Sequence, residues 1–198
     1  DIEFYNSMIE GGSSDNKDAA TAVYVEGETP TKVAGRLLLD GCTVNGGTSY
    51  STTSSYGTGG GALQAAYLVS ITIKDSSLSH GKNGKSSTLP QVIEDVWGKK
   101  NANSTFVFKG TVNLKANGSA SNGILYIQEP ITLGEGAVVT FDGAKLTRNN
   151  GTTAFIVDSD ANATVTTSKD SYYTGLSTVT MEAPSSVLFQ TTGASGWA

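Results

Sequence analysis

Residues 38–44, LLDGCTV, contain the pattern that decides the fold, because similar segments recur along the chain. The related segments are EFYNSMI at 3–9, TIKDSSL at 72–78 and TFDGAKL at 140–146. Each has an apolar residue, then Gly, Asn or Asp two places later, then a small residue and another apolar residue. Self-similarity at a fixed period is the sequence signature of a solenoid.

The repeat has an anchor position occupied by a large apolar residue, and successive anchors are 35, 34, 35 and 33 residues apart. These anchors are Phe4, Leu39, Ile73, Phe108 and Phe141. Two positions before them stand Ile2, Leu37, Ile71, Phe106 and Val139. Apolar residues two apart mark a strand with one buried face, so each repeat is expected to contain a strand that ends near its anchor.

Residues that tolerate a left-handed backbone follow each anchor after two positions. They are Asn6, Gly41, Asp75, Gly110 and Gly143. An apolar column resumes five positions after the anchor with Ile9, Val44, Leu78 and Leu146, and Leu114 replaces Asn113 in the fourth repeat after a local bulge. The sequence therefore predicts a strand, a one-residue left-handed corner and a second strand in every repeat.

Other apolar segments supply a third strand per repeat. They are AVYV at 22–25, GALQA at 61–65, ILYI at 124–127 and FIV at 155–157. The segment STLPQVIEDVWGKK at 87–100 predicts one short helix near residues 90–97, with a lateral strand as the alternative. From about residue 150 the repeat fades, although ATVTTSK and SSVLFQTTG still indicate strands, so 150–198 is less regular and a candidate cap.

The fold prediction is all-β: a parallel β-helix with three-strand rungs of roughly 34 residues, forming one domain over residues 1–198. We expect these residues to be a fragment of a longer chain, with neighbouring domains covering the ends of the coil.

Composition narrows the function classes. The net charge is −5, and Arg36 and Arg148 are the two arginines, which argues against a nucleic-acid partner. Cys42 is the single cysteine, so no intrachain disulfide is possible. No apolar stretch of 18 residues occurs, so no membrane span is expected in this segment.

The segments GGALQAAYLVSITIKDSSLSHGKNG, at 60–84, and TAVYVEG with GRLLLDGCTVNGG, within 21–47, resemble rungs of a known group. They are similar to the right-handed parallel β-helices of microbial surface proteins, such as autotransporter passengers, polymorphic outer-membrane proteins and adhesin-like proteins. The resemblance implies a right-handed coil, also called pectin-lyase-like, and a location outside the cell or on the surface of a bacterium or archaeon.

Few residues point to catalysis. Asp40, Asp75 and Asp142 recur near the corner, but their registers differ, and we expect them to accept backbone hydrogen bonds at turns. His80, the only histidine, is expected to be a loop residue without a catalytic role. Asp158 and Asp160 resemble the opening of a calcium loop that lacks its closing Glu. No metal or cofactor is expected.

Binding is the favoured function, because tyrosines lie among small polar residues in two segments. Such surfaces adapt to a ligand at low entropic cost, and aromatic faces suit sugars. The candidate ligand-binding residues are Tyr50, Tyr56, Tyr172 and Tyr173. The sequence thus predicts a surface adhesin, or the stalk that displays one, which binds a glycan or host protein. The alternatives are a polysaccharide lyase or glycoside hydrolase on the same fold, and a spacer without a ligand.

Overall fold

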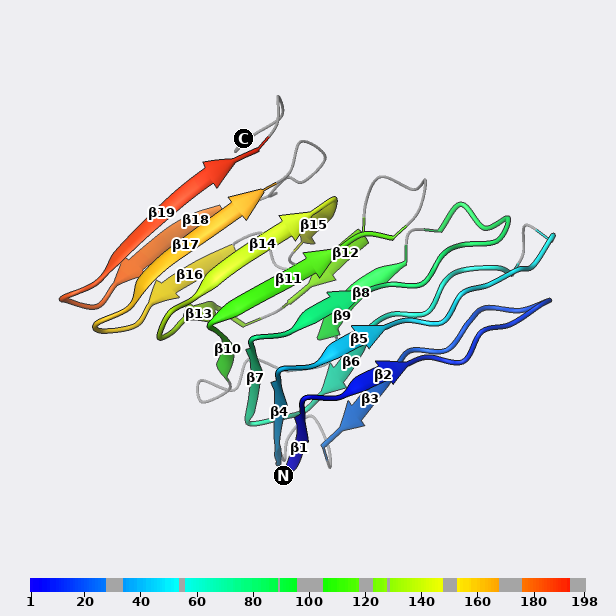
Figure 1. The fold of residues 1–198 in the computed structure, drawn as a ribbon, viewed down its shortest axis with the longest axis horizontal. Coiled ribbons are helices and arrows are strands. Elements are labelled where there is room, and N and C mark those ends of the chain that lie inside the picture. The colour runs from blue at the N-terminus through cyan, green and yellow to red at the C-terminus, as the bar shows by residue number, and fades with distance from the viewer. Residues whose placement is uncertain are drawn as a thin grey trace.

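The computed structural model describes residues 1–27, 34–53, 56–88, 90–95, 105–117, 123–127, 129–147, 153–167 and 176–192. These residues form the predicted all-β coil, a parallel β-helix whose strands stack into three parallel sheets (Figure 1). Within the described part of the chain, no helix is long and apolar enough to cross a membrane.

The sheets are named by their place in each rung. The first sheet contains β1 (Ile2–Tyr5), β4 (Arg36–Asp40), β7 (Ser70–Lys74), β10 (Thr105–Lys109), β13 (Ile131–Leu133), β16 (Thr153–Val157) and β18 (Leu176–Met181). The second contains β2 (Met8–Glu10), β5 (Thr43–Asn45), β8 (Ser77–Ser79), β11 (Thr111–Lys115), β14 (Val138–Asp142), β17 (Asn162–Thr167) and β19 (Ser186–Thr191). The third contains β3 (Val23–Glu26), β6 (Leu63–Ala66), β9 (Gln91–Asp95), β12 (Gly123–Tyr126) and β15 (Ala144–Thr147).

The first four repeats have the predicted register. Phe4 pairs with Leu39, Leu39 with Ile73, and Ile73 with Phe108 in the first sheet. In the second sheet, the column of Ile9, Val44, Leu78 and Leu114 is also in register, as predicted with Leu114 in place of Asn113. The corner residues of these rungs, Asn6, Gly41, Asp75 and Gly110, all have a positive φ, between 46° and 66°.

The fifth repeat was predicted in the wrong register. Phe108 pairs with Leu133, whereas Phe141 pairs with Leu114 in the second sheet. Gly143, with φ of 67°, therefore turns the chain from the second sheet into the third and not from the first into the second. Both corners require an inward apolar residue followed by a left-handed residue, so the local pattern does not distinguish them.

Two further predictions were wrong: the short helix near 90–97, and the assignment of FIV at 155–157 to the third strand of a rung. The predicted helix near 90–97 is wrong, because Gln91–Asp95 forms strand β9, while residues 96–100 lie outside the described residues. The segment FIV at 155–157 belongs to β16 in the first sheet. Backbone pairing with β6 and β12 on either side determined the conformation of β9, which the short apolar run alone left ambiguous.

The coil continues beyond residue 150. β16 and β18 extend the first sheet, and β17 and β19 extend the second, as the strand predictions for ATVTTSK and SSVLFQTTG require. The third sheet has β15 as its last strand among the described residues.

The core is a continuous apolar column enclosed by the three sheets. Its largest fully buried side chains include Phe106, Phe108, Phe141 and Phe155, and the rings of Phe106 and Phe108 meet edge to face with centroids 5.4 Å apart. Burial of each such ring contributes about 1.5–3 kcal/mol to the free energy of folding, so the interior stabilises these rungs.

Three rungs carry extensions between the second and third sheets, which we call the arms (residues 11–21, 46–61 and 80–90). Figure 1 shows them reaching beyond β2, β5 and β8. In each arm, one segment leaves the second sheet and another returns to the third sheet, and these segments alternate in one ladder of backbone hydrogen bonds. In this ladder, at 2.8–3.0 Å, Gly81 N donates to Gly60 O, Gly60 N to Gly47 O, Gly47 N to Ala20 O, and Ala20 N to Gly12 O.

Glycine is required in the arms by close backbone packing. A Cβ on Gly81 would collide with the carbonyl oxygen of Gly47, and a Cβ on Gly60 would collide with that of Ala20. Collagen uses glycine for the same reason, because only a hydrogen fits where backbones crowd together. The arms are therefore packed backbone layers, and their bases form one wall of the site described next.

Candidate functional site

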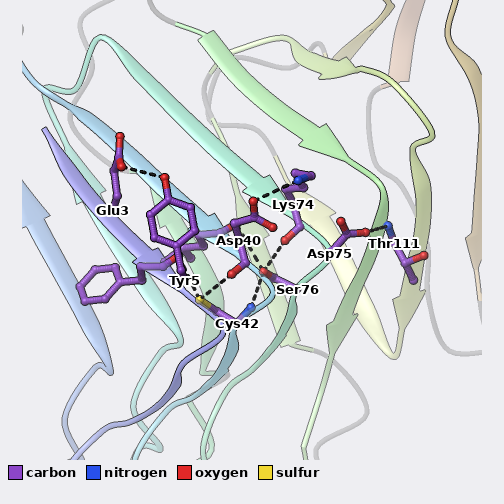
Figure 2. Close-up of polar contacts among 10 residues, drawn as sticks. Glu3, Tyr5, Asp40, Cys42, Lys74, Asp75, Ser76 and Thr111 are labelled. Atoms are coloured by element: carbon purple, nitrogen blue, oxygen red, sulfur yellow. Dashed lines mark hydrogen bonds and ion pairs between the residues drawn. The ribbon is translucent and has the colours of Figure 1, made fainter.

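The corner between the first and second sheets carries a column of polar contacts (Figure 2). Asp75 Oδ1 accepts the backbone N–H of Thr111 at 2.9 Å, as predicted for a carboxylate at a turn. Asp40 instead forms an ion pair with Lys74 at 3.0 Å, and this contact raises the pKa of Lys74. Asp142 lies on β14 in the second sheet, in register with Lys115, so these carboxylates do not gather into one site.

Cys42 and Ser76 reinforce the same corner from inside. Both are buried, and Cys42 N donates to Ser76 Oγ at 2.9 Å while Ser76 Oγ donates to Lys74 O at 2.6 Å. The hydroxyl thus satisfies the buried Cys42 N–H, while Lys74 O also accepts the N–H of Gly41 at 3.0 Å. The contacts of Asp40 with Lys74, Cys42 with Ser76 and Asp75 with Thr111 each link neighbouring rungs, which is a structural role.

His80 is fully buried after β8, at the base of the third arm. Its Nε2 accepts the backbone N–H of Asn117 at 3.0 Å, which leaves Nδ1 to donate to Gly81 O at 2.6 Å. Burial lowers the pKa of His80, and the hydrogen bond to Gly81 opposes that shift. The imidazole is a neutral structural link between two rungs.

Asp158 and Asp160 form the turn between β16 and β17. Asp160 has φ of 61°, and Ala161 N donates to Asp158 O at 3.1 Å, which is an ordinary backbone turn. In the parts of the chain that the structure describes, no group of three or more His, Cys, Asp or Glu side chains could hold a metal ion.

The structure describes two of the four predicted tyrosines. Tyr50 and Tyr56 lie in the second arm and are 63% and 55% exposed. Neither lines the two hollows described below. Tyr172 and Tyr173 lie outside the described residues. The second arm thus presents exposed aromatic rings that lie outside these two hollows.

The outer face of the third sheet carries a column that the sequence analysis did not single out. Tyr24 is in register with Gln64, Gln64 with Glu94, and Glu94 with Tyr126. Their strand neighbours Val23, Leu63, Ile93 and Leu125 are buried, so alternation turns the column outward. The two tyrosines are separated by three strand steps, or about 14 Å along the coil.

A hollow of about 270 Å³ lies at the Tyr24 end of this column, lined by Tyr24, Glu26, Gln64, Ala66 and Tyr67. Tyr24 is 59% exposed, and its hydroxyl donates to Glu26 Oε2 at 2.7 Å, which fixes the ring beside the hollow. This hydrogen bond raises the pKa of Tyr24. Tyr67 has φ of 59°, an unfavourable backbone for a bulky residue.

A second hollow of about 290 Å³ lies between the third sheet and the arm bases, and Gln64 lines both hollows. Its lining includes Asp18, Thr58, Thr88, Gln91 and Glu94. We call the two hollows together the third-sheet groove.

A β-bulge brings Gln91 and Glu94 together. In the pairing with β12, Gln91 is opposite Ile124 and Ile93 is opposite Leu125, so Val92 is the extra residue. In the amide orientation that satisfies both groups, Gln91 Nε2 donates to Glu94 Oε1 and Oε2 at 3.0 and 2.8 Å. Burial raises the pKa of Glu94, and the Gln91 hydrogen bond opposes the rise. Bulges commonly re-aim side chains in this way beside functional sites.

The pKa of Asp18 is shifted in the opposite direction to that of Glu94. Its Oδ1 accepts the backbone N–H groups of Thr58 at 2.8 Å and Gly57 at 2.7 Å, and these hydrogen bonds lower the pKa of Asp18. The groove therefore combines a carboxylate fixed as the ion with a carboxyl group whose ionisation is disfavoured.

Sequence reasoning missed this groove for an identifiable reason. Alternation within AVYV and GALQA already predicts that Tyr24 and Gln64 lie on the outer face of their strands. Their alignment with Glu94 depends on treating 91–95 as a strand with a bulge, and Asp18 approaches only through the arm.

Comparison of the chain with protein-family models, curated proteins and solved structures yields no match, so the function is argued from this geometry.

Proposed function

We propose that the chain is a segment of an extracellular microbial surface protein, an adhesin or the stalk that displays one, and that the third-sheet groove binds a glycan. The observation that carries this proposal is the outer column itself: an exposed Tyr24, an amide and a carboxyl group in register beside two hollows that share Gln64. Ligand sites are typically concave, with aromatic surface and a few convergent polar groups.

The direction of the column favours an extended ligand. A chain of sugars lying along the coil axis would meet a tyrosine ring, then the Gln64 amide, then Glu94, at steps of about 4.8 Å. The ring offers an apolar face for the C–H side of a sugar, while amide and carboxyl groups pair with hydroxyls. A stacked coil also holds these groups on rigid strands, which suits a display function.

The second candidate is a glycoside hydrolase. Asp18 and Glu94 line the same hollow, and their pKa values are shifted in opposite directions. A protonated acid and an ionised carboxylate are the pair that glycoside hydrolysis requires. A lyase is less favoured, because neither hollow has Lys or Arg among its described lining residues to act as a base.

The test is a glycan-binding array on the purified 198 residues, followed by titration of each hit against two variants. Tyr24→Ala removes the ring of the groove, and the matched control Tyr50→Ala with Tyr56→Ala removes the exposed rings of the second arm. We expect Tyr24→Ala to weaken binding about tenfold or more, since stacked aromatic contacts dominate such sites. The double variant should bind like the wild type.

Two outcomes would contradict a glycan site in the third-sheet groove. Loss of binding only in the double variant would place the site on the second arm, and no binding by a folded chain would leave a spacer. Incubation of each hit with the protein and analysis of chain length then separates binding from hydrolysis. Shortened products that disappear with Glu94→Gln would establish the enzyme.

A further inference from the structure

We infer that the third-sheet groove selects glycans of neutral or amino sugars and rejects polyuronates. This inference rests on the proposed function and adds the ligand's charge class. It is carried by the placement of charge around the two hollows.

The charged side chains among the described lining residues of the groove are all acidic. Asp18 and Glu94 line the larger hollow, and Glu26 lines the smaller one. Among the described residues that line either hollow, none is Lys, Arg or His. A carboxylate on every sugar would therefore meet carboxyl groups without a neutralising partner, and concave walls strengthen such repulsion.

Asp18 cannot readily avoid this repulsion by taking up a proton. Its Oδ1 already accepts two backbone N–H groups, from Gly57 and Thr58, and both hydrogen bonds favour the ionised form. The side chain of Thr58 adds a further hydrogen bond that favours the ionised form of Asp18. A ligand hydroxyl or ammonium group can donate to this carboxylate, whereas the carboxylate of a uronate can only repel it.

The neutral groups of the groove complete the selectivity. Gln64 lines both hollows, and Thr58 and Thr88 line the larger one. Amides and hydroxyls both donate and accept, so they suit the hydroxyl groups of an uncharged sugar. An amino sugar gains in addition the attraction of its ammonium group to the carboxylates and to the face of Tyr24.

The experiment compares three oligosaccharide sets of equal length in one buffer: neutral hexose oligomers, glucosamine oligomers and galacturonate oligomers. Dissociation constants are measured by calorimetry for the wild type, for Asp18→Asn with Glu94→Gln, and for the control Glu135→Gln. Glu135 is exposed at the turn between β13 and β14, outside the groove lining. Circular dichroism verifies that each variant retains its β structure.

We expect the wild type to bind neutral or glucosamine oligomers at least about tenfold more tightly than galacturonate oligomers, a difference typical of uncompensated charge. Asp18→Asn with Glu94→Gln should lose most of that discrimination, while Glu135→Gln should keep it. Galacturonate binding as tight as neutral binding, and lost in Tyr24→Ala, would overturn this inference but leave the glycan site standing. Absence of binding in all three sets would overturn both.

Discussion

The N-terminal and C-terminal halves of the coil solve the same packing problem with rungs of different length. From Phe4 to Leu39, Ile73 and Phe108, equivalent residues are 35, 34 and 35 positions apart. From Phe108 to Leu133, Val157 and Met181, they are 25, 24 and 24 positions apart. The first two shorter rungs contain a strand in each of the three sheets, so the additional residues of the longer rungs are not needed for the coil, and they include the arms.

The difference also separates the apolar core from the candidate site. Both halves bury an apolar column, but only the armed rungs supply Asp18, Thr58 and the other arm-base residues that wall the groove. The arms contribute a site through backbone layers that have almost no side chains to bury. Three changes test this division, from the largest expected effect to the smallest.

The largest effect is expected in the core of the C-terminal half. Phe141→Ala removes a fully buried ring from β14 and should lower the free energy of unfolding by about 3–5 kcal/mol. Chemical denaturation followed by circular dichroism measures the change. If the arms determined the stability of the coil, this variant would unfold at nearly the wild-type denaturant concentration.

A smaller effect is expected in the arms. Gly81→Ala forces a Cβ against the backbone of Gly47, so it should cost about 1–3 kcal/mol and weaken ligand binding, because the arm bases shift. The control is Gly134→Ala in the C-terminal half, where the new Cβ would meet the flexible side chain of Lys109 at 3.1 Å. Equal destabilisation by the two substitutions would show that backbone crowding in the arms has no special weight.

The smallest effect on stability is expected from His80, which links the third and fourth rungs. His80 joins the third arm to Asn117 after β11, and its neutral form accepts that hydrogen bond. Burial lowers the pKa of His80, so its stabilising contribution is present above pH 6.5 and is lost as pH falls through the folded-state pKa.

Between pH 7 and pH 5, the free energy of unfolding should fall by at most about 1.4 kcal/mol per pH unit from this one group. Urea denaturation across that range measures the slope. His80→Gln keeps an acceptor but cannot titrate, so its curve should be flatter. A slope identical to that of the wild type would assign the pH dependence to other groups.

The features of the fold that could be predicted are those determined by neighbouring residues within one repeat. Alternation around Phe4, Leu39, Ile73 and Phe108 gave the first sheet, and Asn6, Gly41, Asp75 and Gly110 gave the corner. Prediction was wrong at Phe141 because the repeat shortens there, and at 91–95 because a short apolar run suits either a helix or a strand. The exposure of Tyr50 and Tyr56 agrees with a loop of small polar residues, although neither joins the groove.

The sequence by itself determined a stacked β-coil with left-handed corners, because backbone sterics and apolar alternation act over a few neighbouring residues. Only the tertiary structure decided which residues share a surface. Tyr24, Gln64 and Glu94 are aligned by strand register, and Asp18 is brought to them by the glycine ladder of the arms. The register between two strands depends on the lengths of all the segments between them, and these lengths cannot be read from the residues around any one strand.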